Sequence, residues 1–172
     1  MKNKYNLALT PVSKTADFIK CSQQFSAIAD KYLLGKNSLP HITLHKFSVD
    51  EVLVEDVWQT VCDVWKEKPI NLEFVTLNCT TFDKIIYWVS LMPNHRDVLF
   101  KLNGMLADVI KQPMKRAFDP HLTLVNTKNK AYEQDVNKFS NQFSSITDTF
   151  VLSLGKSDEV GQLAEVIHIY SQ

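Results

Sequence analysis

Two hydrophobic periodicities alternate along this sequence. Apolar residues recur every second position in some segments, which predicts β-strands, and at helical spacing in others, which predicts amphipathic helices. The strand pattern covers residues 5–10, 41–47, 70–74, 84–92, 121–125, 149–155 and 162–170. The helical pattern covers residues 13–34, 48–68, 94–113 and 132–143. The chain therefore alternates short strands and helices, and it ends in a hairpin.

Polar residues at the predicted helix starts suggest caps. Ser13 precedes the first helix, Ser48 with Glu51 has the spacing of a capping box, and Asn94 with Asp97 precedes the third helix. We expect these side chains to bind the free N–H groups of each first turn.

One short motif occurs twice. Residues 40–44 read Pro-His-Ile-Thr-Leu, and residues 120–124 read Pro-His-Leu-Thr-Leu. In a strand, His41 and Thr43 lie on one face while the aliphatic residues between them lie on the other. Each motif thus buries its aliphatic side chains and presents an imidazole and a hydroxyl.

The offset of 80 residues between the motifs also relates the strands and helices around them. We interpret the chain as a single domain of two pseudo-repeats, at about 4–80 and 84–170, each a β-α-β-α-β unit, followed by one closing strand. The predicted fold class is α+β, with two lobes and a central cleft between two mainly antiparallel sheets. Each lobe would place one histidine strand at the cleft.

Composition narrows the possible partners. The chain has 172 residues, of which 45% are hydrophobic, and its 19 basic and 19 acidic residues give zero net charge. A strongly basic surface for long nucleic acid is therefore not expected, and any nucleic-acid substrate would be a short oligomer, an end or a single nucleotide. Three cysteines without a C-x-x-C motif fit free thiols, and no apolar run is long enough to span a membrane. We expect a cytoplasmic monomer that does not associate with membranes.

Two His-x-Thr motifs, one in each half of a chain of this size, resemble the 2H phosphoesterase superfamily. The resemblance is greatest to its RNA 2',3'-cyclic phosphodiesterases and 2'-5' RNA ligases, and in layout it covers nearly the whole chain. It implies that His41 and His121 are catalytic imidazoles and that Thr43 and Thr123 bind phosphate. It leaves the substrate open, because members cleave cyclic phosphates, 2'-5' linkages and RNA 3' ends.

The chemistry of the residues agrees with this resemblance. Opening a cyclic phosphodiester requires removal of a proton from water and delivery of a proton to the departing ribose oxygen. Two imidazoles on opposite sides of the phosphorus can do both, and hydroxyls can stabilise the charge on the non-bridging oxygens. Neither a metal nor another cofactor is required. His41-x-x-x-His45 superficially imitates a zinc pair, but it lacks a helical context and the glutamate of the metalloprotease motif.

Further residues are candidates for substrate binding. His45 would share the strand face of His41 and lie at the rim, and Phe118 could stack a base. The cations that could contact phosphate are Lys46, Lys115, Arg116 and Lys156. Each cation could equally be a solvated surface charge, and Phe118 could equally belong to the core.

These observations favour a metal-independent phosphodiesterase that hydrolyses 2',3'-cyclic phosphate ends or 2'-5' linkages of RNA, with ligation as a possible reverse activity. A non-catalytic module that binds nucleotide ends or RNA is the alternative from another class. Within the family, the alternatives are a 3'-to-5' RNA-trimming nuclease and a cyclic phosphodiesterase acting on ADP-ribose derivatives. The sequence leaves open which histidine is the base and which the acid.

Overall fold

The computed structural model describes residues 2–113 and 116–171. The strands are β1 (Lys2–Pro11), β2 (Ile42–Asp50), β3 (Ile70–Thr81), β4 (Tyr87–Pro93), β5 (Leu122–Thr127), β6 (Ile146–Ser157) and β7 (Leu163–Ile169). The α-helices are α1 (Thr15–Gln23), α2 (Val54–Val64), α3 (Arg96–Ile110) and α4 (Tyr132–Ser140), and short 3-10 helices occur at Ser26–Ile28 and Glu51–Leu53. This order is the one that the hydrophobic pattern predicts.

The strands form one sheet in which every pairing is antiparallel. The strand order is β2-β1-β6-β3-β4-β5, and β7 pairs with β6 outside this path. The α+β class and the antiparallel character are thus confirmed. The two predicted sheets are continuous with each other, because Ile70–Phe74 of β3 pairs with Ile146–Phe150 of β6.

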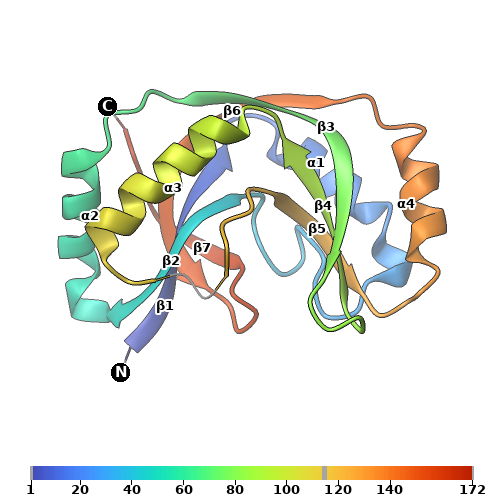
Figure 1. Ribbon diagram of the computed structural model, residues 1–172, viewed down its shortest axis with the longest axis horizontal. Coiled ribbons are helices and arrows are strands. Elements are labelled where there is room, and N and C mark those ends of the chain that lie inside the picture. Colours follow the sequence, from blue (N-terminus) through green and yellow to red (C-terminus); the bar gives the residue numbers. More distant parts are fainter. Residues whose placement is uncertain (1, 114–115, 172) are drawn as a thin grey trace.

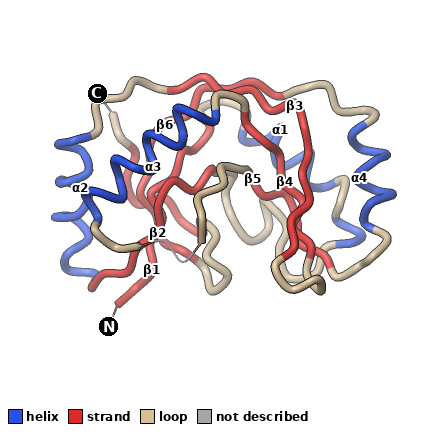
Figure 2. Tube along the Cα trace, in the orientation of Figure 1, coloured by secondary structure: helices blue, strands red, loops and turns tan. Residues whose placement is uncertain are grey.

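The sheet splits into two lobes beyond this shared pairing. The first lobe contains β1, β2, β7 and the second half of β6, whereas the second lobe contains β4, β5 and the second half of β3 (Figure 1). Helices α2 and α3 lie on the first lobe, and α1 and α4 lie on the second, with the strands between them (Figure 2). Since α1 packs against β5 and α3 against β2, each half of the sequence contributes one helix to the lobe of the other half.

If the labels β1, β2 and β3 are exchanged with β4, β5 and β6, the strand order reads β5-β4-β3-β6-β1-β2. This is the observed order read from the other edge of the sheet. This is the order expected for two lobes related by a pseudo-twofold axis. The symmetry supports the two proposed pseudo-repeats, whose origin by duplication stays a prediction.

Aromatic side chains hold the two lobes together at the shared pairing. Phe18 of α1 packs edge-on against Phe74 of β3, at 5.2 Å between ring centroids, and against Phe150 of β6, at 5.9 Å. All three rings are fully buried. Burial of three large rings at the junction makes the pairing of β3 with β6 part of the core.

The first helix ends much earlier than predicted. It stops at Gln23, and the chain from Asp30 to Leu34 runs beside β5, where the N–H groups of Asp30 and Leu34 donate to the carbonyls of Asn126 and Leu124. The apolar spacing in 24–34 is real, but these side chains are buried against the second lobe outside any long helix, as Phe25 is against Phe139 of α4 and Tyr32 against Trp88 of β4. Pairing with another strand has overridden the local helical pattern.

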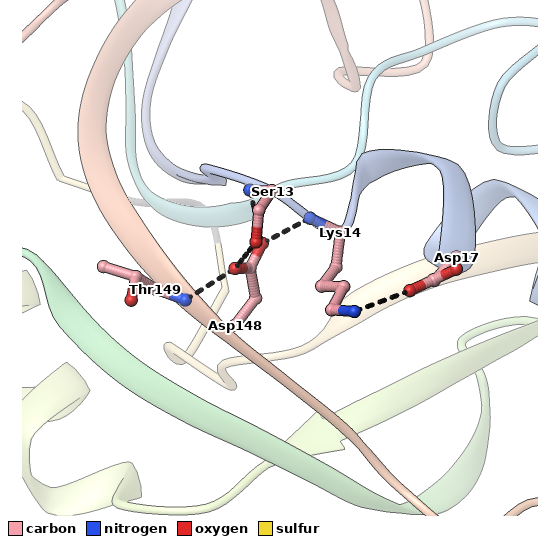
Figure 3. A network of polar contacts seen from close by, with 5 residues as sticks. All are labelled: Ser13, Lys14, Asp17, Asp148 and Thr149. Atoms are coloured by element: carbon pink, nitrogen blue, oxygen red, sulfur yellow. Dashed lines mark hydrogen bonds and ion pairs between the residues drawn. The ribbon is translucent and has the colours of Figure 1, made fainter.

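The predicted caps are wrong in all three helices. Ser13 does not cap α1; its N–H and hydroxyl donate to the carboxylate of Asp148, which also accepts from the N–H groups of Lys14 and Thr149 (Figure 3). Asp148, on β6, therefore fixes the connection between β1 and α1.

The other two predicted caps have different partners. Ser48 lies within β2, and no side-chain cap is present at the start of α2. The amide oxygen of Asn94 accepts from the N–H of Glu73, and His95, with φ of 53°, precedes α3.

The three cysteines, Cys21, Cys62 and Cys79, are partly buried and form no disulfide. Within the described residues, no helix has both the length and the apolar character needed to cross a membrane.

Candidate active site

The two motif histidines are held in the same way. Each lies immediately before its strand, and its Nδ1 is within hydrogen-bond distance of the carbonyl two residues earlier: 2.7 Å from Leu39 for His41, and 2.6 Å from Asp119 for His121. A carbonyl can only accept, so Nδ1 must carry the proton. In the neutral ring, Nε2 is then the basic atom, and in the charged ring it is the atom that can donate.

The strand register shows which side chains share the face of His41. Ile42 is opposite Leu9, Thr43 is opposite Ala8, and Lys46 is opposite Asn6. A bulge at Leu44 shifts the alternation, so Thr43 and Lys46 lie on the same face although three positions separate them. The histidine, the hydroxyl and the ammonium group of the first motif therefore lie on one face of the sheet.

The second motif has a bulge at the same position. Thr123 is opposite Ser90, and Asn126 is opposite Trp88, with the irregularity at Leu124. Thr123 is buried and Thr43 is half-buried. Neither threonine hydroxyl forms a hydrogen bond with another described residue.

The bulge also overturns the prediction for His45. Instead of sharing the face of His41 at the rim, His45 is opposite the core residue Leu7 and is fully buried. Its Nε2 donates to the carbonyl of Gln112 at 3.0 Å, and the Gln112 side chain bonds both N–H and carbonyl of Ser48. His45 therefore ties the segment that follows α3 to β2. A strand pattern without a bulge puts His45 on the face of His41, so the sequence pattern alone could not indicate that His45 is buried and bonded to Gln112.

Lys46 lies within electrostatic reach of both motif histidines, and its charge lowers the pKa of each. Desolvation lowers the pKa of Lys46 itself, with Asp158 opposing this shift and Arg116 adding to it. The ammonium group packs over Gly161, 3.0 Å from the position that a Cβ there would occupy. The β6–β7 turn thus helps to hold Lys46.

The histidines differ in their electrostatic surroundings. Burial lowers the pKa of His41 to about 4, against the opposing hydrogen bond to Leu39. Burial also lowers the pKa of His121, but there both the carbonyl and the carboxylate of Asp119 act in the opposite direction. His121 is therefore the one of the two imidazoles with an acidic neighbour.

The remaining predicted binding residues are dispersed. The Arg116 guanidinium lies 3.6 Å from the centre of the Phe82 ring, and it is close enough to Lys46 to lower its pKa. Phe118 packs edge-on against Phe100 of α3, at 5.2 Å, so its ring belongs to the helix layer. Lys115 lies outside the described residues.

Lys156 is on the other side of the sheet. It is paired with the core residue Tyr5 in the register of β1 and β6, and its ammonium group lies 3.4 Å from the carboxylate of Glu51. It is therefore separated from Lys46 by the sheet itself.

Comparison with known proteins identifies the fold. LigT of E. coli, solved in complex with 3'-AMP, matches with a TM-score of 0.62 over 99% of this chain and 97% of LigT, at 13% identity. The chain shares the fold of LigT. A structure described as a phosphoesterase matches with a TM-score of 0.59 at 11% identity, covering 98% of this chain and 97% of its own. Usb1 of Kluyveromyces marxianus matches with 0.51 at 12%, covering 96% and 95%.

The likeness to LigT and Usb1 shows a shared fold, and this agrees with the two-lobed α+β layout that the sequence predicts. No family model matches the sequence, and no curated protein sequence matches it. With identities this low, the comparison establishes the architecture and leaves the activity to be argued from the site.

Within this LigT-like fold, the residues that shape the second lobe's side of the site carry no recognisable sequence signal. Asn126 corresponds to Lys46 by the offset of 80, but its amide oxygen accepts from the N–H groups of Lys31 and Tyr32. The Tyr32 hydroxyl is 2.5 Å from that of Ser38 and 3.4 Å from the carbonyl of Thr123. The site is therefore asymmetric, with a cation on the first lobe and a backbone-binding amide on the second.

Other polar groups lie away from the two motifs. His168 of β7 is 2.7 Å from Glu55 and stacks on Trp58 of α2. No three His, Cys, Asp or Glu side chains within the described part of the chain are grouped to hold a metal ion. A hollow of about 210 Å³ beside Trp65 and one of about 270 Å³ beside Val57 include neither motif histidine.

Proposed function

We propose that this protein is a metal-independent phosphodiesterase that hydrolyses 2',3'-cyclic phosphate ends or 2'-5' linkages of RNA, with His41 and His121 as the acid–base pair. One observation carries the proposal. Two imidazoles from opposite lobes are within electrostatic reach of each other, and in each the Nδ1 proton is bound to a backbone carbonyl. Both rings are thereby oriented with Nε2 available for proton transfer.

The proposed reaction transfers one proton at each side of the phosphorus. Nε2 of the neutral imidazole removes a proton from water as the water oxygen bonds to phosphorus, and the charged imidazole donates its proton to the ribose oxygen as the P–O bond breaks. The proton lost by one ring and the proton gained by the other are exchanged with solvent before the next turnover. If a 5'-hydroxyl of a second RNA end replaces water, the same two proton transfers join it to phosphorus as the ribose oxygen leaves, which accounts for a possible ligase activity.

Hydroxyl and ammonium groups stabilise the charge that develops during this step. Thr43 and Thr123 share the faces of their histidines, so their hydroxyls can donate to the non-bridging oxygens. The Lys46 charge affects both imidazoles, which supports a role for its ammonium group at the same phosphate. The first lobe thus supplies a histidine, a hydroxyl and a cation, and the second a histidine and a hydroxyl.

The choice of substrate rests partly on related structures. LigT has been solved with 3'-AMP and with phosphate, and Usb1 with uridine monophosphate. We therefore propose a nucleotide or short RNA end as the ligand. The balanced charge of the chain argues against a long nucleic acid and hence against the trimming nuclease.

A module that binds nucleotide ends without turnover is the second candidate. It would need the phosphate-binding groups but would have no chemical use for two imidazoles oriented in the same way. The bond to the preceding carbonyl in both motifs therefore favours the enzyme.

The test is release of phosphomonoester from 2',3'-cyclic mononucleotides and from 2'-5' linked oligoadenylates, with EDTA present. The wild type should turn over, and His41→Ala and His121→Ala should each lose about 10²- to 10⁴-fold in kcat, which is the usual contribution of a general acid or base. His95→Asn is the control, because His95 is exposed and asparagine tolerates its positive φ.

The variants also separate the two candidates. If His121→Ala binds the product nucleotide but no longer turns over the substrate, the enzyme is supported. If the wild type binds nucleotides without turnover, the binding module is supported. Activity that depends on added metal would overturn the proposed mechanism.

A further inference from the structure

An exposed aromatic ring and a guanidinium lie in contact beside the candidate active site. Phe82 is in the turn between β3 and β4 and is 58% exposed, and the Arg116 guanidinium covers it at 3.6 Å from the ring centre. Neither residue belongs to a His-x-Thr motif.

This contact joins the two lobes. Phe82 belongs to the second lobe, whereas Arg116 follows a segment that is fixed to the first lobe through Gln112 and its bonds to His45 and Ser48. Arg116 is also close enough to Lys46 to affect its pKa, and Lys46 affects both motif histidines. The contact of Arg116 with the Phe82 ring therefore lies close to the lysine whose charge also affects the two imidazoles.

The position of Phe82 sets a minimum length for any ligand that reaches it. The β3–β4 turn lies past the end of β4 that pairs with Thr127 of β5, four residues beyond Thr123. Because Leu124 is bulged, three residues of β4, from Ser90 to Tyr87, cover this stretch, which at about 3.3 Å per strand residue is roughly 10 Å from Thr123. A ligand that bridges this distance is longer than the terminal phosphate and its own ribose.

We propose that Phe82 and Arg116 form a subsite for the nucleotide that precedes the terminal one, so that the substrate is an oligonucleotide and not a mononucleotide. This proposal rests on the proposed function of the histidines. An exposed aromatic face stacks any nucleobase, and a guanidinium plane can stack a base or bind the phosphate that links it to the next nucleotide. Stacking accounts for an apolar ring held in solvent beside a charged site.

The test compares two substrates that end in the same group. Turnover of adenosine 2',3'-cyclic phosphate is measured beside turnover of a triadenylate with the same cyclic end. Phe82→Ala should raise KM for the triadenylate about tenfold more than KM for the mononucleotide, because the lost stacking affects the longer substrate. Phe82→Trp should keep the preference for the triadenylate. Arg116→Lys, which keeps the positive charge but loses the planar guanidinium, should weaken this preference.

Ile85→Ala is the matched control, because Ile85 is equally exposed on the same turn but has no aromatic face. Equal changes on the two substrates, or an Ile85→Ala effect as large as that of Phe82→Ala, would overturn the subsite.

A binding measurement separates failure of the subsite from failure of the proposed function. Labelled triadenylate is titrated into wild type and Phe82→Ala, and fluorescence anisotropy reports Kd without any need for turnover. If neither substrate reacts but Phe82→Ala still weakens triadenylate binding, the subsite stands and the hydrolytic function fails. If turnover is normal and the two proteins bind triadenylate equally, the function stands and the subsite fails.

Discussion

His41 and His121 share a backbone anchor but have different neighbours. His41 is buried among neutral groups and positive charge, which lowers its pKa to about 4. The Asp119 carboxylate raises the pKa of His121 against the larger effect of burial, and the same carboxylate forms an ion pair with Arg96. Substitution of Asp119 therefore changes the pKa of His121 while both imidazoles stay in place.

Replacing Asp119 by asparagine removes the charge that favours the imidazolium of His121, so the pKa of His121 should fall further. In a pH profile of kcat/KM, the essential base sets the acidic limb and the essential acid sets the alkaline limb. We expect one limb to move to lower pH. Movement of the acidic limb identifies His121 as the base, and movement of the alkaline limb identifies it as the acid.

Asp17→Asn provides the control for this profile, because Asp17 is an exposed carboxylate on α1 that pairs with Lys14. An unchanged profile for Asp119→Asn, or an equal shift of both limbs, would contradict the role of Asp119.

At the level of elements, local pattern predicts the strand and helix order and the two histidines, because both follow from apolar spacing and a repeated motif. The same pattern fails where distant contacts decide. The end of α1 is set by pairing of residues 30–34 with β5, and the face of His45 is set by the bulge at Leu44. Phe82 gives no signal in the sequence, since the proposed subsite depends on its contact with Arg116 across the lobes.

The connection between β1 and α1 depends on a carboxylate of β6. Asp148 accepts four hydrogen bonds, three from Ser13 and Lys14 and one from its neighbour Thr149. Asp148→Asn should lower the free energy of unfolding by about 2 kcal/mol at pH 7, because an amide cannot accept all four bonds and places its own N–H groups against donors. Urea unfolding of the two proteins measures the difference.

This loss should depend on pH with a defined sign. Burial raises the pKa of Asp148, but the hydrogen bonds outweigh it and leave the pKa below the ordinary value of 3.8. The carboxylate therefore stabilises the fold above that value and loses its effect as the pH falls through the folded pKa. A difference between wild type and Asp148→Asn that stays constant from pH 7 to pH 2.5 would contradict this account.

In the whole molecule, neither half of the sequence forms a complete lobe by itself. Helix α1 packs on β5 and α3 packs on β2, while Phe18, Phe74 and Phe150 bury the junction of β3 with β6. The two proposed pseudo-repeats would thus be sequence units, and each lobe needs elements from both halves of the chain. The candidate site has one histidine from each lobe, so its geometry depends on the same exchange of helices α1 and α3 between the lobes.

Division of the chain after residue 83, in the exposed β3–β4 turn, tests this interdependence. Fragment 1–83 lacks the strand that covers α1, and fragment 84–172 lacks the strand that covers α3, so each leaves a large apolar face in water. We expect neither fragment alone to show a cooperative thermal transition by circular dichroism, and an equimolar mixture to regain one. A cooperative transition in either isolated fragment would show that a pseudo-repeat folds independently and that the exchanged helices are dispensable for stability.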